Sequence, residues 1–192
     1  MATKGYYLAF NEVTKFIKEN LGKNQSEIKF KNKIQNWYQQ LFKPKVQSGG
    51  ASPSLLVGYR NKPVFIRGSR HTPANFSIIG EVMENFLELL DSETSPVARA
   101  VLGHFVLVFI HPFPDGNVGT ARFLMNVALT LSGYNWTVIR NERKTEYFKS
   151  LEQASVHGKI EGFVTFIINE LNVSKNISQQ QLLKNKRINQ AT

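Results

Sequence analysis

The segment that decides the fold is HPFPDGNVGTAR, residues 111–122. It follows VARAVLGHFVLVFI, residues 97–110, which is apolar nearly all round and therefore predicts a central buried helix. Pro96 suits the first position of that helix and Ser95 its N-cap. A histidine ends the helix, a tight loop with a carboxylate, a glycine and an asparagine follows, and a second helix then begins.

Each residue type in this loop suits a phosphate-containing substrate. The first N–H groups of a helix and the positive end of its dipole bind phosphate, and Gly116 allows the positive φ that brings the backbone close to an anion. Asn117 can donate to a phosphate oxygen, Asp115 can hold Mg²⁺ and Arg122 can clamp a phosphate. His111 titrates near neutrality and can take a proton from an attacking hydroxyl. The loop therefore predicts a site for phosphoryl or nucleotidyl transfer.

This run resembles the motif of the Fic family, HxFx[D/E]GN[G/K]RxxR, and the matching residues are His111, Phe113, Asp115, Gly116, Asn117 and Arg122. Four longer blocks also resemble family segments: GYRNKPVFIRGSRHTP (58–73), AVLGHFVLVFIHPF (100–113), RFLMNVALTLSGYNWTVI (122–139) and EYFKSLEQAS (146–155). The resemblance covers roughly residues 55–170.

The resemblance implies an all-α Fic fold with a small β-hairpin flap and the activity of a protein adenylyltransferase. His111 would deprotonate a Tyr, Thr or Ser hydroxyl of a target protein, which would attack the α-phosphorus of ATP, the donor substrate. Asp115 would bind the cofactor Mg²⁺, and Phe113 would point inward as an anchor. The residues expected to bind the nucleotide and its phosphates are Gly116, Asn117, Val118, Gly119, Arg122 and Tyr147.

The flap implied by the resemblance spans residues 59–67, and the target protein would dock there as an added strand. Its contacts would come from Val64, Phe65, Ile66 and Arg67, whose alternation also favours a short β-hairpin within residues 55–71. An inhibitory segment of the family form [S/T]xxxE[G/N] is not found, because Val82 breaks the match begun by Ser77 and Glu81. We therefore expect that inhibition comes from an inhibitory partner protein or from residues outside this sequence, or that it is absent.

Two residues depart from the family pattern. Val118 and Gly119 stand where the motif has Gly or Lys followed by Arg. Loss of a charge-assisted bond to phosphate costs about 1.5–3 kcal/mol, which is roughly 10- to 150-fold in rate or binding. Val118 disfavours a positive φ, and Gly119 weakens the first helical turn by about 1 kcal/mol. The alternative function is thus a weakly active or inactive nucleotide-binding or protein-interaction module, unless Lys62, Arg67 or Arg70 replaces the missing charge.

Hydrophobic periodicity predicts the remaining helices. They are expected over residues 5–21 with Gly22 as the stop, from Ser26 to a break at Pro44, from residue 74 onward, from the motif to Gly133, and over residues 144–156 and 160–172. The predicted organisation is a helical N-terminal extension (1–50), a Fic core (51–172) and a loosely ordered polar tail (173–192).

Composition excludes some classes of function. The absence of cysteine excludes disulfides and thiol chemistry, and no run of about 18 apolar residues predicts a membrane span. The N-terminus lacks the pattern of a secretory signal, so a cytoplasmic protein is expected, or an effector exported without a classical signal. The net charge of +10 comes from dispersed basic residues, which favours an ordinary soluble surface. Nucleic-acid binding is suggested by charge alone and has no groove-reading motif behind it.

Overall fold

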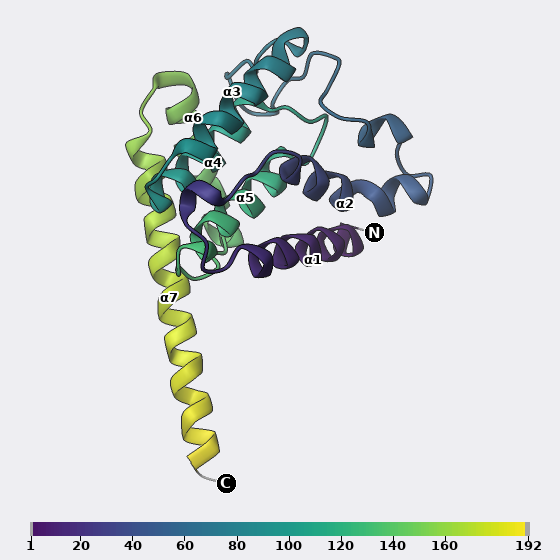
Figure 1. Cartoon of the computed structure of the whole chain (residues 1–192). Coiled ribbons are helices and arrows are strands. Elements are labelled where there is room, and N and C mark those ends of the chain that lie inside the picture. The colour runs from purple at the N-terminus through teal and green to yellow at the C-terminus, as the bar shows by residue number, and fades with distance from the viewer. Residues whose placement is uncertain (1, 191–192) are drawn as a thin grey trace. The chain divides into compact units, whose positions relative to one another are not determined.

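The computed structural model describes the backbone of residues 2–190 and the side chains of residues 3–181. The chain divides into two compact units, Met1–Leu131 and Ser132–Thr192. All regular elements in the described residues are helices (Figure 1), which confirms the prediction of an all-α chain.

The first unit contains five α-helices and three short 3₁₀ helices: α1 (Ala2–Asn20), η1 (Gln25–Glu27), α2 (Lys33–Gln47), η2 (Pro53–Leu56), η3 (Phe76–Ile78), α3 (Ile79–Ser92), α4 (Pro96–Ile110) and α5 (Asn117–Leu131). The second unit contains η4 (Asn141–Arg143), α6 (Lys144–His157) and α7 (Glu161–Gln190).

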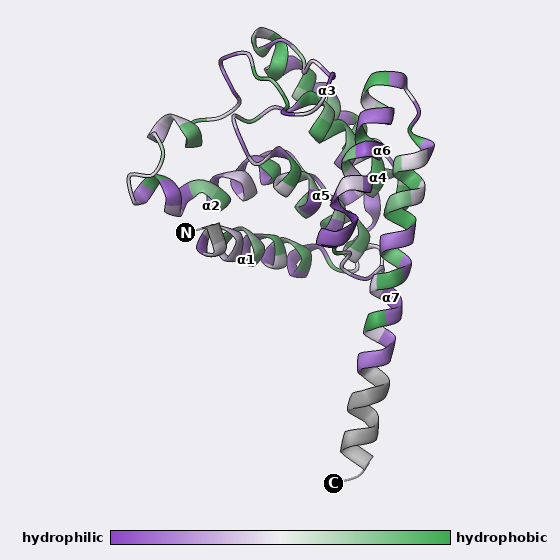
Figure 2. Ribbon diagram, turned by 180° about the vertical axis from the view of Figure 1, so that it is seen from behind, coloured by the Kyte–Doolittle hydropathy of each residue, from purple (hydrophilic) through white to green (hydrophobic). Residues whose placement is uncertain are grey.

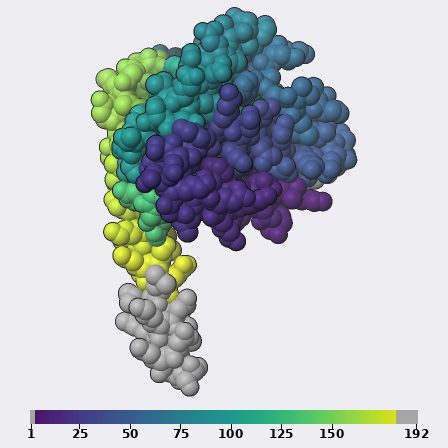
Figure 3. All heavy atoms as spheres, viewed as in Figure 1, coloured from purple at the N-terminus to yellow at the C-terminus, as the bar shows by residue number. Residues whose placement is uncertain are grey.

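The core of the first unit forms where α4 packs along α5 and where α1 packs against α2 and α5. Helix α1 is amphipathic, with hydrophobic and hydrophilic residues alternating along it in Figure 2, and its apolar side is buried. Phe16 of α1 lies 5.6 Å from the ring of Trp37 and 5.9 Å from that of Phe30, measured between ring centroids. In the space-filling view the atoms of α1 and α2 form one continuous surface (Figure 3). The N-terminal helices are therefore packed against the helix that follows the motif.

The ends of α4 and α5 match the sequence signals. The hydroxyl oxygen of Ser95 accepts from the N–H of Ala98, and Pro96 occupies the first position of α4. Gly133, with φ of 79°, follows the end of α5. Since α4 ends at Ile110 and α5 begins at Asn117, the six residues between them must carry the motif loop.

The prediction for the second helix is wrong at both ends. Ser26 lies in the 3₁₀ helix η1, and α2 begins at Lys33 after Asn32, whose φ is 64°. The intervening Ile28 and Phe30 are fully buried, so core packing and not helical spacing explains their apolar character. Pro44 lies inside α2, close to its end, where the helix loses one N–H bond and the buried ring offsets part of that loss.

The predicted β-hairpin is also wrong, because residues 55–71 form no strand. Pro63 has no N–H to donate to a ladder. The side chain of Arg60 occupies the carbonyls of Lys62 and Ala74, which a hairpin would need for pairing. The segment is held instead by this arginine and by contacts to the motif loop.

The second unit packs aromatic rings between α6 and α7. Tyr147 is fully buried, and its ring centroid lies 5.8 Å from that of Phe166 and 6.2 Å from that of Phe163. The buried carboxylate of Glu170 accepts two hydrogen bonds from Arg140, at 2.9 and 3.0 Å. Helix α7 continues to Gln190, where the sequence predicts a loose tail, because no glycine or proline interrupts residues 163–190.

No helix among the described residues is both long enough and apolar enough to cross a bilayer. The predicted domain limits at residues 50 and 172 stay predictions.

Candidate functional site

His111 is the C-cap of α4 and has a left-handed backbone, with φ and ψ both 55°. Its Nδ1 lies 3.2 Å from the carbonyl oxygen of Val108. A carbonyl oxygen only accepts, so Nδ1 carries the proton and Nε2 keeps its lone pair. Burial is the largest cause that lowers the pKa of His111, and the bond to Val108 opposes it. The imidazole is therefore a neutral base at pH 7, with Nε2 as the basic atom.

Charged neighbours also act on the pKa of His111. Electrostatic interactions with Arg60 and His71 lower it, and the interaction with Asp115 raises it. These groups come from the segment before α3 and from the motif loop, so both segments determine the protonation of the histidine.

The motif loop is anchored through Phe113 and Asn117. Phe113 is fully buried and stacks on Tyr38 of α2, with ring centroids 4.0 Å apart and an angle of 6° between the planes. The inward anchor predicted at Phe113 is confirmed. Buried Asn117 accepts from the N–H of Phe113 and donates to its carbonyl, both at 2.9 Å. Both ends of the Asn117 amide are used inside the loop, so this residue sets the shape of the loop.

Gly116 meets two requirements at once. Its φ is 73°, and a Cβ added there would lie 2.3 Å from Cε2 and 2.7 Å from Cζ of Phe42 in α2. Glycine is therefore needed for both the backbone conformation and the close approach of α2. The carbonyl of Gly116 accepts from the N–H of Thr120 at 3.0 Å, which opens the hydrogen bonding of α5.

The N-terminus of α5 includes both residues that depart from the family motif. Val118 and Gly119 lie in the first turn of α5, where backbone N–H groups have no partner within the helix. The valine at position 118 meets no conflict with a positive φ, because Asn32 and His111 are the only non-glycine residues with positive φ in the described chain. A Cβ at Gly119 would meet only Leu41 Cδ2, at 3.5 Å, which is an ordinary contact.

Arg122 is half-buried one turn further along α5. Its charge contributes to lowering the pKa of His104 to about 3, although burial of His104 is the larger cause. The same charge opposes the rise that burial causes in the pKa of Tyr6. Arg122 therefore lies close to buried α4 on one side and to the first turns of α1 on the other.

Asp115 is exposed at the tip of the loop, and its Oδ1 accepts from the N–H of Gly116 at 2.7 Å. It lines a pocket with a volume of about 440 Å³ together with Lys45, Tyr59, Arg60 and Lys62. Positive charge from Lys45 and Lys62 is thus available in the pocket that contains the acidic motif residue. Neither Arg67 nor Arg70 lines it.

The residues predicted for the flap form no strand: Val64, Phe65 and Ile66 are irregular, and Arg67 lies in a turn in which the N–H of Ser69 donates to the carbonyl of Ile66 at 3.1 Å. Phe65, which is 89% exposed, and Arg67 face solvent, whereas Val64 and Ile66 are half-buried. At the first residue of the predicted flap, the ring centroid of Tyr59 lies 5.7 Å from that of Phe113, and burial raises the pKa of Tyr59.

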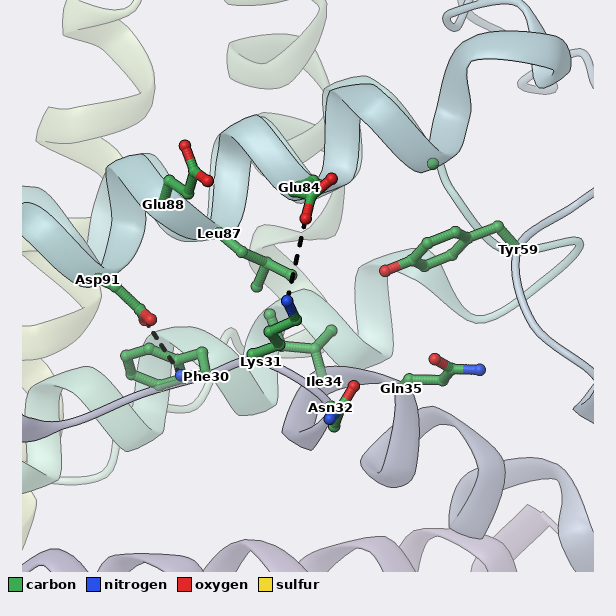
Figure 4. A pocket seen from close by; sticks show the side chains of 11 residues that line it. Phe30, Lys31, Asn32, Ile34, Gln35, Tyr59, Glu84, Leu87, Glu88 and Asp91 are labelled. Carbon is green, nitrogen blue, oxygen red and sulfur yellow. Dashed lines mark hydrogen bonds and ion pairs between the residues drawn. The ribbon is translucent and has the colours of Figure 1, made fainter.

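Tyr59 also borders a second pocket of about 290 Å³, between α3 and residues 30–35. Figure 4 shows its hydroxyl directed into that pocket, across from Leu87 and from an ion pair of Lys31 with Glu84 at 3.9 Å. The first residue of the predicted flap is thus packed on both sides.

The predicted site residues fall into two groups. The motif loop and the first two turns of α5 contain His111, Asp115, Gly116, Asn117, Val118, Gly119 and Arg122. Tyr147 lies in the aromatic core of the second unit, and its predicted contact with the nucleoside stays a prediction. Two residues that sequence reasoning missed are Arg60, which is 5% exposed, and Tyr38, which stacks on Phe113.

The site as described is a helix N-terminus, of a kind suited to anions, beside a neutral histidine. A family model described as the Fic/DOC family matches residues 30–129, which is 100 of the 192 residues. The chain belongs to the Fic/DOC family.

Several curated proteins are similar over part of this chain. The "Protein adenylyltransferase Fic" of Nematostella vectensis is 37% identical over 123 residues, covering 62% of this chain and 28% of that protein. The "Protein adenylyltransferase fic-1" of Caenorhabditis elegans is 32% identical over 123 residues, covering 62% of this chain and 24% of that protein. The aligned part of the chain thus spans about a quarter of the length of these relatives.

Solved structures share the fold. Fic-1 (residues 134–508) from C. elegans superposes with a TM-score of 0.78 at 22% identity, covering 96% of this chain and 52% of that one. A Fic domain containing signaling protein from Bacteroides thetaiotaomicron gives 0.72 at 22% identity, covering 89% and 68%. The N-terminal Fic domain of a Bartonella quintana protein with bound ADP gives 0.54 at 18% identity, covering 88% and 85%.

Proposed function

We propose that this chain is a protein adenylyltransferase, which transfers AMP from ATP to a Tyr, Thr or Ser hydroxyl of a target protein. The observation that carries the proposal is the neutral His111, whose basic Nε2 stands at the loop that opens into the N-terminus of α5. The names of the animal relatives support this reaction class, and the ADP bound to the Bartonella domain supports an adenine nucleotide.

The reaction needs a base for the hydroxyl and positive potential for the phosphates. Nε2 of His111 takes the hydroxyl proton while the hydroxyl oxygen forms a bond to the α-phosphorus. The bond from that phosphorus to the bridging oxygen of pyrophosphate breaks, and pyrophosphate leaves with the electron pair. The N–H groups at the start of α5 stabilise the charge that develops on the α-phosphate, and Arg122 steadies the terminal phosphates.

The proposed cofactor is Mg²⁺, bound by Asp115. No group of three or more His, Cys, Asp or Glu side chains suited to a metal ion occurs among the described residues. Mg²⁺ in nucleotide sites is usually held by one or two carboxylates and by the substrate phosphates, and an exposed Asp115 at the loop tip fits that pattern. When bound, the ion neutralises charge on the phosphates.

The target segment is proposed to lie along residues 63–67, which end in the turn at Arg67 and Gly68. Phe65 and Arg67 are exposed there and supply an apolar and a cationic contact for side chains of the target. Main-chain hydrogen bonds to an added strand would give this mode its affinity.

The competing function is a nucleotide-binding or protein-interaction module with little or no transfer activity. The observation behind it is Gly119, which leaves the first turn of α5 without the arginine of the family motif. Of the three residues expected to replace the missing charge, Lys62 lines the pocket of Asp115, whereas Arg67 and Arg70 do not.

The test is incubation of the protein with α-labelled ATP and Mg²⁺, together with lysate proteins. We expect a labelled band that His111→Ala abolishes while ATP binding, measured by calorimetry, is retained. His157→Ala, which removes an exposed histidine at the end of α6, is the control and should leave labelling unchanged. Equal labelling by wild type and His111→Ala refutes the role of His111. Binding of ATP without any label supports the module.

A further inference from the structure

Arg60 donates to four backbone carbonyl groups on three segments. Its own N–H donates to the carbonyl of Pro112 at 2.8 Å, and its Nε donates to the carbonyl of His111 at 2.8 Å. Nη1 donates to the carbonyl of Lys62 at 3.1 Å, and Nη2 donates to that of Ala74. One buried arginine therefore joins the motif histidine to both ends of the segment between residues 61 and 74.

The two motif carbonyls that Arg60 binds follow directly on α4. The last carbonyls of a helix have no partner within it, and the negative end of its dipole favours a cation. Arg60 satisfies both needs, since it places a guanidinium at the His111 carbonyl. His111 itself has a left-handed backbone, which is unfavourable for a non-glycine residue. The bonds to the carbonyls of His111 and Pro112 restrain the backbone torsions that hold the imidazole where it is.

The far end of the 61–74 segment has a clamp of its own. Nε2 of His71 lies 2.8 Å from the carbonyl oxygen of Phe109, and the two rings are 4.2 Å apart. This bond reaches α4 at its next-to-last residue but does not involve His111. It therefore holds the segment without fixing the carbonyl group of the motif histidine.

We propose that Arg60 is a positioning residue, which fixes the His111 base and the target-docking segment 61–74 to each other through the carbonyls of His111, Pro112, Lys62 and Ala74. The proposal rests on the proposed function for its catalytic meaning. The hydrogen bonds of Arg60 in the described part of the chain all go to backbone carbonyls, and none goes to the carboxylate of Asp115. Its contribution to transfer is thus the alignment of base and target hydroxyl.

Arginine suits this role and lysine does not. The guanidinium is planar and carries five N–H donors in a rigid fork, so Nε, Nη1 and Nη2 reach three carbonyls in different directions. A lysine ammonium in the same space would keep the charge but could serve the three carbonyls only from one point. The pair Arg60→Lys and Arg60→Gln therefore separates the geometry of the fork from the charge.

The experiment measures three properties of wild type, Arg60→Lys and Arg60→Gln, after thermal unfolding shows that each variant is folded. Hydrogen exchange of residues 61–74 reports whether the segment is held. NMR titration reports the pKa of His111, which the charges of Arg60, His71 and Asp115 all influence. Transfer of AMP from α-labelled ATP to the lysate protein that the wild type labels reports kcat and the KM for ATP. His71→Phe keeps a ring against Phe109, loses the second clamp and serves as the comparison.

Both Arg60 variants should lose protection across 61–74 and show kcat reduced roughly 100-fold, the scale of an ångström of misplacement, with little change in the KM for ATP. Arg60→Gln should also raise the pKa of His111, because it removes a positive charge. Arg60→Lys keeps that charge, so the pKa of His111 should stay close to its wild-type value while kcat stays low. His71→Phe should loosen residues 68–74 and cost less in kcat.

Unchanged exchange across 61–74 together with unchanged His111 titration in folded Arg60→Gln overturns the proposal. A kcat restored by Arg60→Lys overturns the role of the fork. Absence of transfer in the wild type refutes the proposed function, while the exchange and titration results still decide the role of Arg60.

Discussion

Replacing Gly116 with alanine separates two reasons for the glycine in the motif loop. A residue with a Cβ at φ of 73° pays about 1–2 kcal/mol for its left-handed backbone. The added methyl group would also lie 2.3 Å from Cε2 of Phe42, and overpacking of this kind costs about 1–3 kcal/mol. We expect Gly116→Ala to lose about 2–5 kcal/mol in all, or roughly 4–20 °C in Tm for a chain of this size.

Gly22→Ala is the matched control for this change. Gly22 has φ of 83°, and an added Cβ would meet nothing within 4 Å. It should cost the backbone term alone, about 2–8 °C. The assay is thermal unfolding followed by circular dichroism. Adding Phe42→Leu to Gly116→Ala removes the ring atoms that clash and should recover part of the lost Tm. If Gly116→Ala were no worse than Gly22→Ala, and Phe42→Leu gave no recovery, the packing argument would be refuted.

Two further predictions concern the motif and the buried core. The double variant Val118→Gly and Gly119→Arg restores the family residues. It should raise the rate of AMP transfer by roughly 10- to 150-fold, which corresponds to one charge-assisted bond to phosphate. No increase in the rate would mean that Lys62 or another cation already supplies the charge. His104 has a pKa lowered to about 3, chiefly by burial, so the unfolded chain binds a proton that the folded chain does not as pH falls below about 6.5. Stability should therefore fall between pH 6.5 and about pH 3 by up to about 1.4 kcal/mol per pH unit. Denaturant unfolding of wild type and His104→Leu over this range should show a smaller pH slope in the variant.

The buried helices could be predicted because their signals are local. Ser95 and Pro96 mark the start of α4, an unbroken apolar run marks its burial, and His111 marks its end. The motif loop was equally readable, since its function depends on residues that are contiguous in sequence. Family membership followed from that loop and from the blocks on either side of it.

The flap and the second helix could not be predicted because tertiary contacts determine them. Val64 to Arg67 alternate as a strand does, but no partner strand is present in the described residues, and Arg60 takes the carbonyls that pairing would use. The role of Arg60 is invisible in the sequence, since an arginine 51 residues before His111 has no spacing relation to it. Ile28 and Phe30 are apolar for a long-range reason too, because they fill the core as extended chain.

The departure of the motif at Val118 and Gly119 is a loss of charge and not of geometry. Neither residue has a positive φ, so the first turn of α5 keeps its helical form with a valine present. The loop conformation depends on Gly116 and Asn117, which match the family motif, and on Phe113 stacked against Tyr38. A Cβ at Gly119 has room beside Leu41, so an arginine could be accommodated there without moving the loop.

The conformation of the motif loop is thus retained, and only the positive charge of the missing arginine is lost. We therefore expect the rate of AMP transfer to depend on how much positive charge the remaining lysines and Arg122 bring to the phosphates. The rate of AMP transfer as a function of salt concentration tests this expectation. If exposed Lys62 supplies the charge, salt should slow transfer by the wild type more than transfer by Gly119→Arg, because salt screens an exposed charge more strongly than one in the first turn of α5.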